Sequence, residues 1–217
     1  MSVDDRPRGL LVDWGGVLTS GLREALEAWT EADGIDYDAY FTAVTDWISA
    51  SALEAELNPI HALERGQLAV PDFERRLAAV LRRRDGGPVE PEGLIERMFA
   101  HFEHQPQMSA LVRRARDAGI RTALLSNSWG NSYPRHTWDG MFDAIVISGE
   151  VGLRKPEPDI YHYAADAIGL PPGDCVFVDD LPLNVTGAQA VGMVAIHHTE
   201  YDATRRELEA LFGLDLR

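Results

Sequence analysis

The sequence predicts an α/β protein with a doubly wound parallel sheet and an all-helical cap inserted after the first strand. Three observations support this fold class. Short apolar runs recur along the chain, helical patterns lie between them, and residues 20–104 contain no convincing strand pattern. Continuous apolar runs of about four to six residues are typical of strands buried on both faces of a parallel sheet. Strands that alternate with helices favour the doubly wound arrangement.

The predicted strands follow one another as GLLVDW, RTALLSNS, AIVISGE, CVFVDD and GMVAIHH. A helix is expected in QMSALVRRARDAG, where Met108, Leu111, Val112 and Ala115 recur at helical spacing and Gly119 can end the helix. EPDIYHYAADAIG and PLNVTGAQAVG also begin near a proline and end at a glycine, which is the usual asymmetry of helix ends.

The insertion is expected to contain four or five helices. In PDFERRLAAVLRRR, for example, Phe73, Leu77, Val80 and Leu81 form one apolar stripe. We therefore predict a catalytic core made of residues 1–19 and 105–217, and a helical cap made of residues 20–104.

Composition narrows the possible partners. The chain has 217 residues, 45% of them hydrophobic, and a formal net charge of −15. Such an acidic chain is repelled by nucleic acids and anionic membranes, so we expect neither as a partner. No run approaches the about 20 apolar residues of a membrane span, and the N-terminal residues lack an apolar signal region. These features predict a cytoplasmic protein. The single cysteine, Cys175, excludes an internal disulfide and a cysteine-based zinc cluster.

Polar residues stand where the predicted strands end. Asp13 follows the first strand, Ser126 and Asn127 end the second, and Asp179 and Asp180 end the fourth. In doubly wound sheets, ligands bind beyond the carboxyl ends of the strands. Each residue alone would more often be a turn or capping residue. Their shared position predicts a site with a carboxylate nucleophile, a hydroxyl group and acidic metal ligands.

Lys155 and the glycines after Asp13 complete this candidate site. Lys155 is the only lysine among 20 basic residues, which suggests a position that requires a compact ammonium group. Gly15 and Gly16 allow the backbone to approach a phosphate and direct amide groups at it. Paired carboxylates with positions left for water and phosphate suit Mg²⁺.

Four stretches resemble the motifs of the haloacid dehalogenase superfamily, in that family's order: LLVDWGGVLT, TALLSNS, GLRKPEP and VFVDDLPLNVTGAQAVGM. The resemblance covers essentially the whole chain, including the cap after the first motif. The residues of these motifs are most similar to those of the subgroup that contains the phosphatase domain of soluble epoxide hydrolase.

This resemblance implies roles for the candidate residues. Asp13 would be the nucleophile that forms an aspartyl intermediate. Ser126 and the amide of Asn127 would bind the transferred phosphoryl group, and Lys155 would neutralise that group and the nucleophile.

The resemblance also implies a Mg²⁺ site. Asp180 would bind the ion together with the Asp13 carboxylate and the carbonyl of Gly15, and Asp179 would support the site. Asn184 stands where many relatives carry an acid, and would orient Lys155 or a metal-bound water.

The sequence departs from family phosphatases at Gly15, where they usually carry a second aspartate that acts as general acid and base. Three functions therefore stay open. The first is a Mg²⁺-dependent phosphatase of a small phosphorylated metabolite. The second is other hydrolytic chemistry, such as that of 2-haloacid dehalogenases, although those lack the paired carboxylates. The third is a regulatory module that binds phosphate and Mg²⁺ without turnover. Phosphonate cleavage would need a second lysine, which the chain lacks.

Residues near the junction of core and cap are candidates for substrate selection: Thr19, Arg23, His61, Glu64 and His104. His61 and Glu64 share a helix face, and either could replace the missing acid. The alternative for both is a solvated helix face. Apolar residues on the cap leave a homodimer open.

Overall fold

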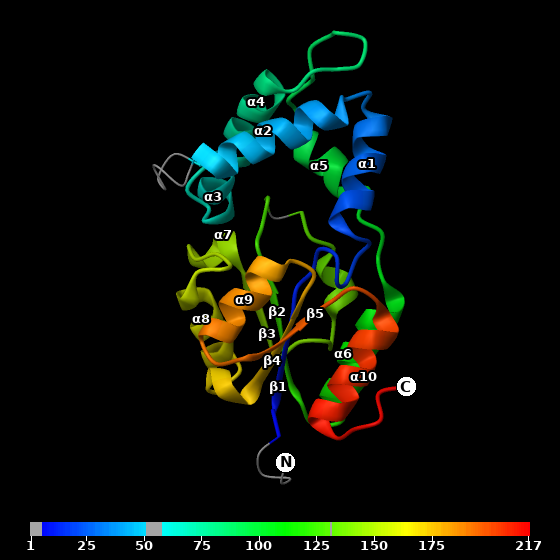
Figure 1. Ribbon diagram of the computed structural model, residues 1–217, viewed down its shortest axis with the longest axis vertical. Helices are drawn as coiled ribbons and strands as arrows, with labels where there is room; N and C mark the ends of the chain where they lie inside the picture. The colour runs from blue at the N-terminus through cyan, green and yellow to red at the C-terminus, as the bar shows by residue number, and fades with distance from the viewer. Residues whose placement is uncertain (1–5, 51–57, 131) are drawn as a thin grey trace.

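The sheet has five parallel strands in the order β3-β2-β1-β4-β5 in a computed structural model that describes residues 6–50, 58–130 and 132–217 (Figure 1). The strands are β1 (Gly9–Val12), β2 (Arg121–Ser126), β3 (Ala144–Ile147), β4 (Cys175–Asp179) and β5 (Val194–His197). All four pairs of neighbouring strands are parallel. The predicted fold class is confirmed, and β1 lies at the centre of the sheet because β2 and β4 flank it.

Helices cover both faces of the sheet. On one face α6 (Pro106–Asp117) and α10 (Tyr201–Phe212) pack against Leu10 and Val12. On the other face α8 (Pro158–Ala167) and α9 (Pro182–Ala190) pack against Leu11. Successive residues of a strand point to opposite faces, so β1 must be apolar throughout, as its sequence GLLV is. Short helices complete the core: α7 (Ser148–Val151), η2 (Arg135–Trp138) and η3 (Pro172–Asp174).

The helices between β1 and α6 form a separate layer above the carboxyl ends of the strands (Figure 1). Their own apolar core includes Trp29, Phe73, Leu77 and Leu94, all fully buried. The helices are α1 (Leu22–Ala32), α2 (Tyr37–Ala50), α3 (Pro59–Glu64), α4 (Val70–Val80) and α5 (Leu94–Phe99). Part of the predicted cap, residues 51–57, lies outside the described residues.

The two segments that connect this helical layer to the core run side by side. Thr19 and His104 form an antiparallel bridge there, and the amide of Ser20 donates to the carbonyl of Glu103 at 2.7 Å. The exact domain boundaries at residues 20 and 104 stay a prediction. No helix among the described residues has the length and apolar character that crossing a bilayer requires.

One detail of the predicted apolar stripe is wrong. Phe73, Leu77 and Leu81 are fully buried, whereas Val80 is 42% exposed. The helix ends at Val80, and Leu81 has an extended backbone with φ −77° and ψ 161°. Val80 still belongs to the helix but lies at the edge of the face that buries Phe73, Glu74, Leu77 and Ala78, so it stays at the surface.

Candidate active site

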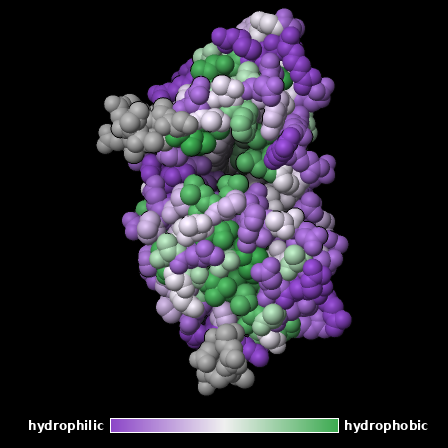
Figure 2. All heavy atoms as spheres, in the orientation of Figure 1, coloured by the Kyte–Doolittle hydropathy of each residue, from purple (hydrophilic) through white to green (hydrophobic). Residues whose placement is uncertain are grey.

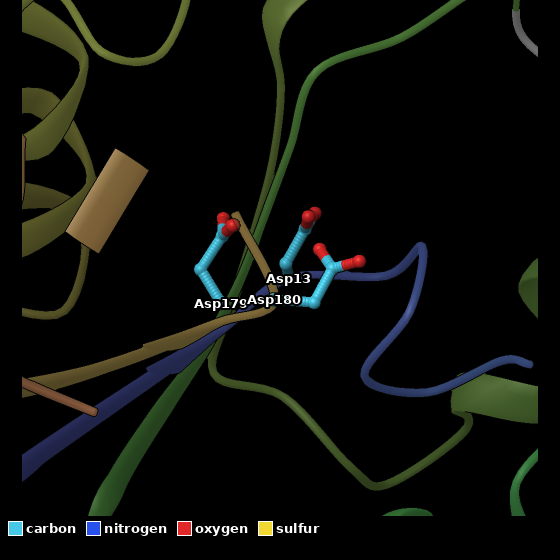
Figure 3. A group of neighbouring side chains, drawn as sticks. All are labelled: Asp13, Asp179 and Asp180. Carbon is cyan, nitrogen blue, oxygen red and sulfur yellow. The ribbon is translucent and has the colours of Figure 1, made fainter. Parts of the chain in front are cut away.

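Three carboxylates meet at the carboxyl ends of β1 and β4 (Figure 3). Asp13, Asp179 and Asp180 each place an oxygen atom within 4.8 Å of the others. Strand register causes this meeting, because Val12 is paired with Val178 and the Asp13 amide donates to the Val178 carbonyl at 2.9 Å. Asp13 and Asp179 are buried, and Asp180 is half-buried.

The ammonium group of Lys155 lies between two of these carboxylates. Its Nζ atom is 2.9 Å from Asp13 Oδ1 and 2.6 Å from Asp179 Oδ2. The residue is only 1% exposed. Burial disfavours the charged ammonium, but the two neighbouring carboxylates outweigh this effect and raise the pKa of Lys155. The lysine therefore stays protonated beside Asp13.

Asp179 already has a full set of hydrogen-bond donors. Asn184 Nδ2 donates to both of its carboxylate oxygens, at 3.0 and 3.1 Å. The Leu181 amide donates to Oδ1 at 2.9 Å, and Lys155 takes Oδ2. These bonds suit a supporting role for Asp179. They also place Asn184 on Asp179, so that it orients Lys155 through that carboxylate.

The three carboxylates carry more negative charge than Lys155 can balance. Burial raises the pKa of Asp13 well above its usual range, against the effect of Lys155. Burial and the charge of Asp179 raise the pKa of Asp180 to about 6. An excess of oxygen ligands and negative charge fits a hard divalent cation such as Mg²⁺.

The two glycines after Trp14 differ in how much space surrounds them. At Gly16, where φ is +70°, a Cβ atom would lie 2.1 Å from Asp180 Oδ2, so only glycine fits. At Gly15, a Cβ atom would meet Phe102 Cε1 at 3.9 Å, an ordinary contact. The Gly16 amide donates to Thr19 Oγ1 at 3.2 Å rather than pointing at the carboxylates. The lack of a side chain at residue 15 is therefore not imposed by crowding.

Ser126 and Asn127 extend from the end of β2 in different directions. Ser126 Oγ lies 2.9 Å from the hydroxyl of Tyr133. The Asn127 side chain accepts from the Lys155 amide at 2.8 Å and donates to the Lys155 carbonyl at 3.0 Å. Asn127 thus fixes the backbone that carries Lys155.

Tyr133 is a site residue that the sequence did not reveal. Its ring packs edge-on against Trp14, with 5.1 Å between ring centroids, and Trp14 in turn stacks on Phe99 at 5.5 Å. The ring centroids of Phe102 and Trp14 are 5.4 Å apart. The only signal in the sequence was an aromatic-rich stretch after Ser126, which cannot show which ring reaches the serine.

Of the two cap residues that could replace the missing acid, Glu64 already has other partners. Glu64 is 7% exposed. It accepts from Arg154 Nε at 2.6 Å and from Trp129 Nε1 at 3.2 Å. Although burial raises the pKa of Glu64, the contact with Arg154 favours its carboxylate form. Burial and the charge of Arg154 lower the pKa of His61 to about 4, so its imidazole is neutral at pH 7. The solvated helix face considered for both residues is wrong for Glu64.

The remaining junction residues lie on another side of the site. Thr19 and Arg23 line a cavity of about 660 Å³ that also reaches Gly16 and Asp180. His104 is exposed and contributes its backbone to the bridge with Thr19.

Curated relatives include two phosphatases and a bifunctional hydrolase. A sesquiterpene phosphatase of Aspergillus oryzae is 34% identical over 112 residues, which cover 49% of this chain and 57% of that protein. A phosphoserine phosphatase of Thermus thermophilus is 30% identical over 183 residues, or 76% of this chain and 71% of that protein. Bifunctional epoxide hydrolase 2 of Rattus norvegicus is 32% identical over 124 residues, or 54% of this chain and 22% of that protein. The chain thus spans only part of the first and third of these relatives.

Solved structures share the fold. A HAD family enzyme of Bacteroides thetaiotaomicron, in complex with magnesium and inorganic phosphate, superposes with a TM-score of 0.65 at 19% identity, covering 89% of this chain and 94% of that chain. A structure described as a dehalogenase superposes with a TM-score of 0.66 at 20% identity, covering 97% and 98% of the two chains. At such identities the likeness concerns the fold alone.

The family model for haloacid dehalogenase-like hydrolases matches residues 7–192, from before β1 to the end of α9. This match covers most of the chain and confirms the resemblance seen in the four motifs. The chain belongs to the haloacid dehalogenase-like hydrolase family.

Proposed function

We propose that this protein is a Mg²⁺-dependent phosphatase that acts on a small phosphorylated metabolite through an aspartyl-phosphate intermediate on Asp13. One observation carries the proposal: the Asp13 carboxylate lies at the end of the central strand, 2.9 Å from the buried ammonium of Lys155 and beside two further carboxylates. The phosphatases among the relatives support the same reaction class.

The donor set supports Mg²⁺ as the cofactor. Asp13 and Asp180, with the backbone carbonyl of Gly15, would hold the ion, since Asp179 has its oxygen atoms occupied by other donors. Bound there, Mg²⁺ supplies positive charge that offsets the carboxylates and attracts a phosphate group.

Each residue of the site then has its own role in the reaction. Asp13 supplies the attacking oxygen, and Lys155 holds that carboxylate in place and balances the charge that gathers on the phosphoryl oxygens. Ser126 and the Asn127 amide bind the same phosphoryl group. Because residue 15 has no carboxyl group, the leaving oxygen departs without the usual proton donor. We therefore expect the best substrates to have good leaving groups, such as acyl phosphates or sugar 1-phosphates.

The relatives do not narrow the substrate further. Their names assign a sesquiterpene substrate to one phosphatase and phosphoserine to another. The substrate class of this protein therefore has to be found by screening.

The test is phosphate release from p-nitrophenyl phosphate and from a panel of phosphorylated metabolites, in Mg²⁺ and in EDTA. We expect release only with Mg²⁺, and none from the Asp13→Asn variant. Release that continues in EDTA, or in that variant, would overturn the proposal.

A regulatory module that binds phosphate and Mg²⁺ without turnover is the second candidate. Gly15 favours it, together with the engagement of Glu64 by Arg154, because these two positions supply no free carboxyl group in place of the missing acid. Calorimetric binding of Mg²⁺ and phosphate without hydrolysis across the panel would favour this module. Halide release from 2-haloacids would instead favour the dehalogenase chemistry.

A further inference from the structure

Four charged side chains join the cap to the core. Glu64 and Arg65 end helix α3 of the cap, and Arg154 and Glu157 lie on either side of Lys155 in the core. Arg154 Nε is 2.6 Å from Glu64 Oε2, and Arg154 Nη1 is 3.6 Å from Glu157 Oε1. Arg65 pairs with Glu157. Each side of the junction thus supplies one acid and one base, and the charges alternate.

The Glu64–Arg154 pair of this junction is buried, whereas the side chains of Arg65 and Glu157 are 22% and 37% exposed. The side chains of Glu64 and Arg154 are 9% and 12% exposed. The second carboxylate oxygen of Glu64 accepts from Trp129 Nε1 at 3.2 Å. The backbones are also close, since a Cβ atom at Gly66 would lie 2.5 Å from the Gly149 carbonyl oxygen. Figure 1 shows α3 directly above α7, the helix that contains Gly149. Removing the Glu64 charge leaves the buried Arg154 with only the 3.6 Å contact to Glu157, which weakens the junction.

The core half of the junction is the segment that presents Lys155. Asn127 holds the Lys155 backbone from the core side with hydrogen bonds at 2.8 and 3.0 Å. Arg154, the preceding residue, is held from the cap side by Glu64. The carboxylate of Glu157 contacts both arginines, so Arg154 would keep a partner if the cap moved away. Such an arrangement lets the junction open without stranding the arginine.

We propose that Glu64 is a positioning residue that fastens the cap over the site and, through Arg154, holds the segment that carries Lys155. Cap closure and lysine placement are then one event. The effect on catalysis rests on the proposed phosphatase function, whereas the fastening itself does not.

Hydrogen exchange of the full-length protein tests the fastening. Glu64→Gln keeps the size of the side chain and removes its charge. We expect exchange in residues 59–66 and 149–157 to rise together, by about tenfold or more. Asp33→Asn is the matched control, because Asp33 pairs with Arg97 at 2.7 Å within the cap alone, and it should leave both segments unchanged. Unchanged exchange in Glu64→Gln, or a rise in only one segment, would overturn the proposal.

A double-mutant cycle tests the link to Lys155. Glu64→Gln and Arg154→Gln should each lower kcat more than they raise KM, and the double variant should be no worse than the poorer single variant. Additive losses would overturn the positioning role. If Glu64→Gln does not fold, Glu64→Asp, which keeps the charge but shortens the side chain, should still raise exchange in both segments together. A wild-type protein without turnover would refute the phosphatase proposal, and exchange alone would then decide the role of Glu64.

Discussion

At the end of β1, two residues on either side of Trp14 decide which catalytic groups the candidate site can offer. Asp13 is buried and held by Lys155, whereas Gly15 has no side chain although a Cβ atom would fit there without a clash. The room at Gly15 makes the missing acid testable by restoring it.

Gly15→Asp should speed the hydrolysis of substrates with poor leaving groups by about tenfold or more, because general acid–base help is worth ~10²–10⁴-fold. Hydrolysis of p-nitrophenyl phosphate, whose leaving group needs no proton, should change less. Steady-state kinetics on both substrate types measure the difference. Gly16→Ala is the control for crowding and should lose activity, since its Cβ atom would strike Asp180. Equal rates in Gly15→Asp and wild type would indicate that another group already donates the proton.

We expect the charge of Asp180 to lower the stability of the metal-free protein. Its pKa of about 6 lies above the about 3.9 of an unfolded chain. The folded state therefore favours the protonated form, and stability is lost as the pH rises from about 4 to about 6. A difference of this size between the folded and unfolded pKa corresponds to about 3 kcal/mol in the free energy of unfolding. In EDTA, Asp180→Asn should raise the thermal midpoint at pH 7 and change it little at pH 4.

Magnesium supplies the matching experiment on the same variant. Added Mg²⁺ should raise the thermal midpoint of the wild-type protein by binding the folded state, and should not do so for Asp180→Asn. A lower midpoint for the variant in EDTA at pH 7 would contradict the pKa argument. A retained response to Mg²⁺ would contradict the assignment of Asp180 as a ligand.

The loops that follow β2 and β3 act together because Asn127 crosses between them. Its side chain accepts from and donates to the Lys155 backbone. Asn127→Ala removes both bonds and should lower kcat by about tenfold or more, at about 1 kcal/mol for each bond and with buried backbone groups left unpaired. Asn127→Asp keeps only the oxygen that accepts from the Lys155 amide, so its kcat should lie between those of the wild-type protein and Asn127→Ala. Kinetics at saturating substrate would show this order, and an unimpaired alanine variant would refute the bracing role.

The sequence predicted accurately those strands that are covered on both faces, because such burial requires an unbroken apolar run. β1 and β4 read as apolar runs because they are covered on both faces, and their register brings Asp13 next to Asp179. Val80 was misassigned because helix periodicity does not show where the edge of the buried face lies, and in α4 that face also includes Glu74 and Ala78. The edge of that face depends on how the cap packs.

At the scale of the whole molecule, the packing of the cap on the core creates contacts that the sequence could not reveal. The hydropathy surface shows a hollow between the upper and lower parts, with apolar residues at its edge (Figure 2). Glu64 and Tyr133 acquire their roles from partners far along the chain or on another element, Arg154 and Ser126. No local pattern contains such pairings, whereas the four motifs carry their own spacing. For that reason the gathering of Asp13, Asp179 and Asp180 at the strand ends was predictable, whereas the contact between Glu64 and Arg154 was not.

The most direct test of the central claim is to trap the covalent intermediate. The protein would be mixed with its best phosphorylated substrate and Mg²⁺, quenched in acid, reduced with borohydride, and mapped by peptide mass spectrometry. We predict modification at Asp13, absent in EDTA and in Asp13→Asn. Phosphate release without modification at Asp13, or modification at a different residue, would contradict the claim.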